Sequence, residues 1–212
     1  MNIKYYVRTT GDRNFDYSPL KYEPLVDTER NPMRHFFKCL ELIQDEDAVL
    51  LEDDLELCDN FQEEIERVIT EHPNNIINFF TRRCDFFTSH LSDKFNSNQC
   101  TYYPKGSTIP VVRLFKEKYG GNTQHKYYSA YLDGLLKELG IPNYCYRPAL
   151  VQHKEMTSLL SPNKRQKEQT IYYKKYIDEL KINYEDAFKL ENQLKLKQLL
   201  EKDNKKWEEN YQ

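Results

Sequence analysis

AVLLEDD, residues 48–54, joins four apolar residues directly to three carboxylates. A short apolar run of this kind is typical of a strand that is buried on both faces, as in a parallel sheet. Three adjacent carboxylates repel one another and raise each other's pKa unless a cation lies between them. Oxygen ligands are also what Mg²⁺ and Mn²⁺ prefer. The segment therefore predicts a strand that ends in a metal site, with an ordinary acidic turn as the alternative.

The segments around this run alternate between strand and helix patterns. Residues 3–9 and 76–80 have the composition of strands, and residues 33–43 repeat apolar side chains at helical spacing. Residues 59–71 predict a helix with Asp59 as its N-cap in a capping box. Strands and helices that alternate with short connections predict an α/β fold, with a mostly parallel sheet flanked by helices.

The second half of the chain is less regular. Residues 81–106 are polar and aromatic and are expected to form a loop, and residues 107–112 are expected to form a strand. Residues 127–139 have helical spacing and stop at Gly140, the usual position of a C-terminal cap. Residues 144–146 predict a last short strand.

The C-terminal part is rich in Lys and Glu from residue 170 onward. Its apolar residues between 173 and 194 recur at helical spacing and predict a tail helix packed on the core. We therefore expect a core of residues 1–160 and a helical C-terminal extension of residues 161–212.

Composition excludes several classes of protein. Of the 212 residues, 39% are hydrophobic and 31% are charged, and no stretch approaches the apolar length of a membrane span, about 20 residues. The N-terminus lacks the apolar run of a secretory signal. Five scattered cysteines indicate reduced thiols in a cytoplasmic protein. A net charge of -3 is unlike that of a general nucleic-acid-binding protein.

Two further segments carry candidate chemistry. PALVQH, residues 148–153, ends in His153, and a lone histidine is more often a surface or core residue than a ligand. YLDGLL, residues 131–136, contains Asp133. Its carboxylate is either an acid favoured by the helix dipole or a partly buried general base.

Together the three segments resemble the GT-A-type glycosyltransferases, which use nucleotide-sugar donors and have a Rossmann-like sheet. In that class an acidic DxD-type motif ends a strand, and Glu52-Asp53-Asp54 within VLLEDDLEL is similar to its EDD form. RPALVQHKEMTS, residues 147–158, is similar to the P-x-L-V-Q-H segment that completes the core in several of these families. YLDGLLKELG, residues 131–140, lies where many members carry an Asp followed by apolar residues. The resemblance spans residues 3–160.

The resemblance implies roles for eight residues. Asp54 would hold the Mn²⁺ or Mg²⁺ that bridges the donor diphosphate, and His153 would reach the metal or the pyrophosphate. Asp133 would be the catalytic base. The other five would contact the nucleotide, its ribose or the water shell of the metal: Arg8, Thr9, Asp27, Glu52 and Asp53.

The implied reaction transfers a sugar from a UDP-sugar to an acceptor hydroxyl. A base at Asp133 would invert the anomeric configuration, and the absence of a base would allow retention, so both outcomes stay open. The acceptor is either a glycan or a hydroxymethylated base in DNA, because the small chain is similar to phage-encoded enzymes that modify DNA in the host cytoplasm. DNA would require a basic and aromatic surface, and the candidates for it are Arg82, Arg83, Tyr102, Tyr103, Lys105, Arg113, Lys116, Lys118, Lys126, Tyr127, Tyr128 and Tyr131.

Two other classes stay open. A Mg²⁺-dependent phosphoryl-transfer enzyme or nuclease would use the same strand end, with further carboxylates such as Asp85 and Asp93. A non-catalytic α/β domain would bind another protein through the apolar stripe of residues 173–194. The glycosyltransferase interpretation is preferred because it accounts for all three segments together. The sequence leaves the sugar and the oligomeric state undetermined.

Overall fold

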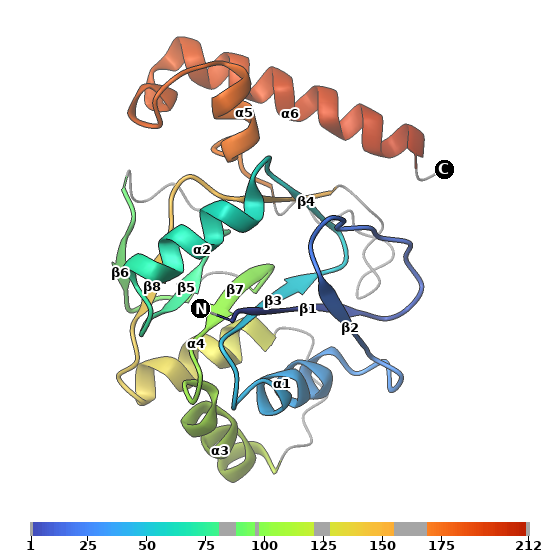
Figure 1. The fold of residues 1–212 in the computed structure, drawn as a ribbon, viewed down its shortest axis with the longest axis vertical. Coiled ribbons are helices and arrows are strands. Elements are labelled where there is room, and N and C mark those ends of the chain that lie inside the picture. The colour runs from blue at the N-terminus through green and yellow to red at the C-terminus, as the bar shows by residue number, and fades with distance from the viewer. Residues whose placement is uncertain (1, 81–87, 96–97, 121–127, 155–168, 211–212) are drawn as a thin grey trace.

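A mixed seven-stranded sheet forms the centre of the computed structural model, which describes residues 2–80, 88–95, 98–120, 128–154 and 169–210 (Figure 1). The strand order is β2-β1-β3-β7-β5-β8-β6. The strands are β1 (Lys4–Thr9), β2 (Tyr22–Val26), β3 (Ala48–Glu52), β5 (Ile76–Asn78), β6 (His90–Ser92), β7 (Cys100–Tyr103) and β8 (Asn143–Cys145). All run in one direction except β7 and β6, which are antiparallel to their neighbours. The α/β class is thus confirmed, with a mostly parallel sheet.

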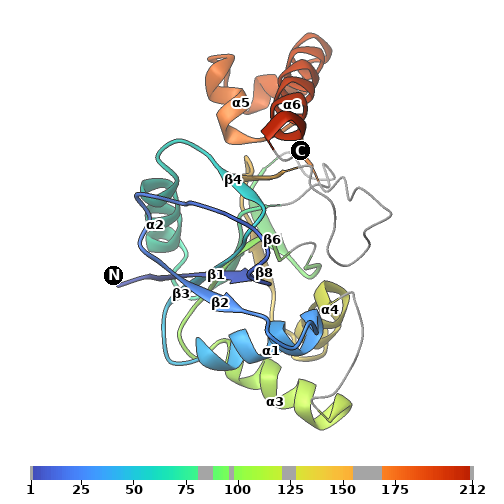
Figure 2. The same cartoon turned by 90° about the vertical axis from the view of Figure 1, so that its right-hand side faces the viewer.

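Helices cover both faces of this sheet (Figures 1 and 2). One face packs against α2, and the opposite face packs against α1, α3 and α4. The C-terminal helices lie beyond the α2 face, at the top of both views. The helices are α1 (Pro32–Leu42), α2 (Phe61–Glu71), α3 (Thr108–Tyr119), α4 (Tyr128–Glu138), α5 (Lys174–Glu179), the 3₁₀ helix η1 (Glu185–Phe188) and α6 (Leu190–Asn210).

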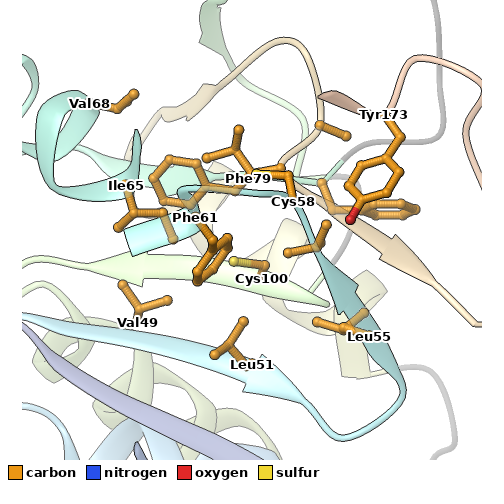
Figure 3. Packing of buried hydrophobic residues seen from close by; sticks show 14 of the residues in the cluster. Val49, Leu51, Leu55, Cys58, Phe61, Ile65, Val68, Phe79, Cys100 and Tyr173 are labelled. Atoms are coloured by element: carbon orange, nitrogen blue, oxygen red, sulfur yellow. The ribbon is translucent and has the colours of Figure 1, made fainter. Parts of the chain in front are cut away.

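Strand β3, which lies inside the sheet between β1 and β7, is buried on both faces, as its apolar run predicts. Val49 and Leu51 join the cluster under α2, which Figure 3 shows, whereas Ala48 and Leu50 join the cluster under α1, α3 and α4. This alternation follows from the period of two along a strand. The apolar run therefore forms both cores at once, and the chain becomes polar where β3 reaches the edge of the sheet.

A second, two-stranded sheet lies at that edge. It pairs β4 (Leu55–Leu57) with β9 (Val151–His153) in antiparallel register, so that Leu55 lies opposite His153. The turn formed by Asp53 and Asp54 connects β3 to β4. The segment that follows the acidic turn and the segment that ends in His153 are consequently joined by backbone hydrogen bonds.

Several expected elements differ from the structure. Residues 81–106 were expected to form a loop, yet they contain β6 and β7, and β7 lies between β3 and β5. Residues 107–112 were expected to form a strand and instead begin α3. Their β-branched composition favours a strand, but Pro110 is tolerated in the first turn of a helix. Val111 and Phe115 then pack on one helical face.

The N-terminal part departs from expectation at two points. Strand β2 lies within a stretch that has no strand pattern, and it contains Pro24, which an edge strand tolerates. Helix α2 is capped by Asn60 rather than by Asp59. Asn60 has a positive φ of 55° and makes no side-chain cap hydrogen bond, so the expected capping box is absent.

The C-terminal extension is not the single helical stripe that its sequence predicts. It divides into α5, η1 and α6, and the chain turns after α5, where Lys181 has a φ of 53°. Tyr173 and Tyr176 are buried in the cluster beneath α2, whereas Leu194 is 55% exposed. The expected boundary at residue 160 lies outside the described residues.

The fold bears on the state of the cysteines and on the question of a membrane span. Cys39, Cys58, Cys100 and Cys145 are buried free thiols, and Cys84 lies outside the described residues. In the part of the chain that the structure describes, no helix combines the length and the apolar character that crossing a membrane requires.

Truncation of Ile65 tests the core. Ile65 is fully buried between α2 and the sheet, and Ile65→Ala should lower the free energy of unfolding by about 2–5 kcal/mol because it leaves a cavity. Leu91→Ala is the control, since Leu91 is 59% exposed and its loss should cost about 0.5 kcal/mol or less. Urea denaturation measures both, and equal losses would contradict this packing.

Candidate functional site

The carboxyl end of β3 meets the end of β9 at one point of the sheet edge. The backbone N–H of Lys154 donates to the carbonyl of Asp54 at 2.9 Å, next to the pair formed by Leu55 and His153. On the other side of β9, the N–H of Leu150 donates to the carbonyl of Phe79 at 3.0 Å. Backbone hydrogen bonds therefore hold the histidine beside the acidic turn.

Glu52, Asp54 and His153 form the one group of metal-ligand type found among the described residues. One potential ligand atom of each lies within 4.8 Å of the others, and His153 Nε2 is 3.3 Å from Asp54 Oδ2. Asp54 is 7% exposed, and its Oδ1 is buried with no hydrogen-bond partner in the described structure. A buried carboxylate oxygen without a donor fits a cation. Carboxylate oxygens suit Mg²⁺ and Mn²⁺, and an imidazole also suits Zn²⁺ and Fe²⁺, so the donor set fits a divalent cation.

Arg8 fixes the side chain of Glu52. Its Nη2 is 2.6 Å from Glu52 Oε1 and donates to the hydroxyl of Tyr128 at 2.6 Å, and that hydroxyl in turn donates to Glu52. The guanidinium carbon also lies 5.0 Å from the ring centre of Phe36 and 4.6 Å from that of Tyr128. This buried arrangement connects β1, β3, α1 and α4, so it orients Glu52 at the edge of the sheet.

Asp53 is held from the end of β1. Thr9 Oγ1 donates to Asp53 Oδ2 at 2.6 Å and accepts from the N–H of Gly11 at 2.9 Å. Arg13 Nη1 is 2.9 Å from Asp53 Oδ1 and 2.6 Å from Asp54 Oδ2. The two aspartates of the turn thus share one guanidinium group.

Tyr17 stabilises the backbone of the acidic turn. Its hydroxyl donates to the carbonyl of Glu52 at 2.6 Å and accepts from the N–H of Leu55 at 3.0 Å. One buried side chain therefore spans the turn from the last residue of β3 to the first residue of β4. The positions of Asp53 and Asp54 are restricted by this bridge.

The charges of the site shift the pKa values of its acids in opposite directions. Burial raises the pKa of Glu52, and the charge of Asp54 adds to this while Arg8 opposes it. Burial would also raise the pKa of Asp54, but His153 and Arg13 lower it well below its usual range. Asp54 is consequently ionised, which is the form that binds a cation.

Asp27 lies at the end of β2, at the same edge of the sheet. Its N–H donates to the carbonyl of Thr9 at 2.7 Å, and its Oδ1 accepts from the N–H of Glu29 at 3.1 Å. The carboxylate is buried and shapes the turn between β2 and α1. Its expected contact with a nucleotide stays a prediction.

Asp133 makes its contacts elsewhere. Its Oδ1 accepts from the N–H of Phe95 at 2.7 Å, and its Oδ2 accepts from Lys137 at 2.6 Å. Both oxygens therefore have partners outside the acidic cluster. Its expected role as a base stays a prediction, and these contacts give it a structural role.

Among the described residues that were expected to bind DNA, several are buried or lie apart from the acidic turn. Tyr102 and Tyr103 are buried within the sheet, so they are not available to stack on a base, and that expectation was wrong. Lys105 lies at the opposite edge, where its N–H donates to Asp47 just before β3. Lys116 and Lys118 form ion pairs with Glu41 and Glu138. Four of the other candidates, Arg82, Arg83, Lys126 and Tyr127, lie outside the described residues.

The C-terminal extension packs against the two-stranded sheet of β4 and β9. Lys175 is 2.7 Å from Glu56 on β4 and 3.3 Å from Asp203 on α6. The side-chain amide of Gln152 on β9 exchanges two hydrogen bonds with the backbone of Thr170, at 2.7 and 3.1 Å. The extension therefore contacts both strands of the small sheet: β4, which follows Asp54, and β9, which carries His153.

Sequence reasoning missed two residues of this site, Arg13 and Tyr17. Both lie between β1 and β2 in a polar stretch without periodicity, so no pattern marks them. Tyr128 was considered only as a surface for stacking bases, whereas its hydroxyl contacts Glu52.

Comparison of the sequence with known protein families finds no match, and comparison with curated proteins finds no relative.

Removal of Arg8 tests the ion pair. Arg8→Met leaves the Glu52 carboxylate buried without its cation and should lower the free energy of unfolding by about 3–5 kcal/mol. The double variant Arg8→Met/Glu52→Gln should recover part of this loss. Arg67→Met is the control, because Arg67 forms exposed pairs whose loss should cost about 1 kcal/mol or less. Equal losses for both arginines would contradict the assigned role.

The lowered pKa of His35 predicts that the stability of the protein depends on pH. Burial, with the nearby charge of Arg8, lowers the pKa of His35 from 6.5 to about 4. The unfolded chain then binds more protons between these values, so stability falls as the pH falls from about 6.5 to 4. His35→Gln should reduce this slope in urea denaturation, with His72→Gln as the control for loss of a histidine. An unchanged slope in His35→Gln would contradict the prediction.

Proposed function

We propose that this chain is a metal-dependent glycosyltransferase, which transfers a sugar from a nucleoside-diphosphate donor to an acceptor hydroxyl. The observation that carries this proposal is the pairing of β4 with β9, with His153 Nε2 3.3 Å from Asp54 Oδ2. The acidic triplet and the histidine come from the two segments whose resemblance to GT-A enzymes is independent of this geometry. Their meeting at one sheet edge supports the proposal.

The site also has the position that such an enzyme requires. Ligands of open α/β sheets bind beyond the carboxyl ends of the parallel strands. Thr9, Asp27 and Glu52 lie at or just beyond the ends of three adjacent parallel strands, β1, β2 and β3. A donor nucleotide across these ends would place its diphosphate near Asp54.

Asp54 and His153 would hold the metal, with Glu52 within reach. When bound, Mn²⁺ or Mg²⁺ would neutralise charge that develops on the departing nucleoside diphosphate. The protein residues orient this arrangement: Arg8 and Tyr128 fix Glu52, Thr9 fixes Asp53, and Tyr17 fixes the turn. Groups held in advance stabilise a transition state without further reorganisation.

Fewer residues of the structure bear on the acceptor than on the sugar donor. A base at Asp133 would first have to release the N–H of Phe95 and the ammonium group of Lys137, so the proposal does not depend on Asp133 to remove the proton of the acceptor hydroxyl. A glycan hydroxyl is favoured over DNA, because the described lysines near α3 are paired with glutamates or lie at the opposite sheet edge.

A phosphoryl-transfer enzyme is less well supported. Two-metal sites need several carboxylates around ions about 4 Å apart. In the ranges that the structure describes, one group of two carboxylates and a histidine is present, and Asp93 does not belong to it. Asp85 lies outside those ranges.

Calorimetric titration tests the proposed function. UDP should bind with micromolar affinity in the presence of Mn²⁺, and Asp54→Asn should weaken binding of Mn²⁺ by about 10- to 100-fold because the negative charge of a ligand is lost. Asp45→Asn is the matched control, since Asp45 is an exposed carboxylate at the other end of β3. If neither UDP nor any other nucleoside diphosphate binds with Mn²⁺ present, the glycosyltransferase proposal fails.

A further inference from the structure

The guanidinium group of Arg13 lies between the two aspartates of the acidic turn, where a positive charge is needed. Its Nη1 lies 2.6 Å from Asp54 Oδ2 and 2.9 Å from Asp53 Oδ1, and its side chain is only 12% exposed. Burial would lower the pKa of this guanidinium, but the charges of Asp54 and Asp53 raise it. Arg13 therefore supplies a permanent positive charge between two carboxylates that would otherwise repel each other.

The carboxylate that Arg13 contacts belongs to the candidate metal site. Asp54 Oδ2 faces both Arg13 Nη1 and His153 Nε2, while Oδ1 of the same carboxylate is the buried oxygen without a hydrogen-bond partner in the described structure. A divalent cation bound to Asp54 would lie within a few ångström of the guanidinium, and two positive charges at such a distance repel strongly in a buried site. Metal and arginine are thus competitors for the same carboxylate.

The acidic turn does not depend on Arg13 alone for its connection to the segment after β1. Arg13 lies between β1 and β2 in a segment without regular secondary structure. The contact of this segment with the turn also runs through Thr9, whose Oγ1 bonds both Asp53 and the N–H of Gly11. Departure of the guanidinium would leave this second connection intact.

The geometry points to Arg13 as a cation that metal binding displaces from the carboxylates and that then binds the donor diphosphate. The first half of this inference concerns the metal alone, and the second half rests on the proposed function. A guanidinium can match two phosphate oxygens with two parallel hydrogen bonds. Here its Nη1 alone contacts both carboxylates, so the other nitrogens of the group take no part in these two contacts. A diphosphate bound to the metal would offer such oxygens next to the residue that the metal displaces.

Two variants of Arg13 separate the two halves. Arg13→Ala removes the competing charge, so Mn²⁺ alone should bind about tenfold more tightly than to the unaltered protein. Arg13→Lys keeps the charge, so its affinity for Mn²⁺ should stay near that of the unaltered protein. Both variants should bind UDP in saturating Mn²⁺ about tenfold more weakly, because neither offers the two-pronged hydrogen bond.

The measurements are electron paramagnetic resonance for free Mn²⁺ and calorimetry for UDP. Arg30→Ala is the matched control, since Arg30 pairs with the exposed Asp12 in the same region and should change neither affinity. Thermal unfolding in the absence of metal checks that each variant is folded. If Arg13→Ala is not folded, Arg13→Gln, which also removes the charge, replaces it in the Mn²⁺ measurement with the same expected result.

The outcomes distinguish this inference from the proposed function. Unchanged or weaker Mn²⁺ binding by Arg13→Ala would overturn the competition. Unchanged UDP binding by Arg13→Lys would overturn the transfer to the diphosphate. If the unaltered protein binds Mn²⁺ but no nucleoside diphosphate, the proposed function and the second half fail together, whereas tighter Mn²⁺ binding by Arg13→Ala would still support the first half.

Discussion

The antiparallel pairing of β4 with β9 is the constraint on which the rest of the site depends. It places Leu55 opposite His153 and so brings an imidazole beside the carboxylate of Asp54. The same two strands receive the C-terminal extension, through Lys175 on Glu56 and Thr170 on Gln152. Backbone register therefore fixes the candidate ligands, and packing of the extension holds that register in place.

The site also depends on a balance between its carboxylates and the basic groups that face them. Three consecutive carboxylates are buried or nearly so, and three nitrogen groups from different parts of the chain face them: Arg8, Arg13 and His153. A buried carboxylate without such a partner would be costly. The acidic turn is tolerated because the fold collects these partners from β1, from the segment after it and from β9.

Periodicity predicted the parts of the fold that bury regular apolar faces. The apolar run of β3 and the helical spacing of α1 and α2 follow directly from their sequences. Strand β7 was missed because its sequence, CTYY, has no apolar alternation, although both tyrosines are buried between β3 and β5. Asp54 and His153 were predicted from residue chemistry and a resemblance, and their proximity comes from tertiary pairing. Arg13 has no sequence signal, because its role arises only from where an irregular segment folds back.

The small sheet also has a consequence for biosynthesis. β9 follows β4 by about a hundred residues, a long-range pairing that is slow to form. Because a chain is made from its N-terminus at about 5–20 residues per second, the acidic turn emerges several seconds before its histidine does. During that interval the nascent chain carries the carboxylates together with Arg8 and Arg13, their two arginine partners, but without His153. The group of three candidate ligands is therefore completed only after the last strand of the small sheet has been made.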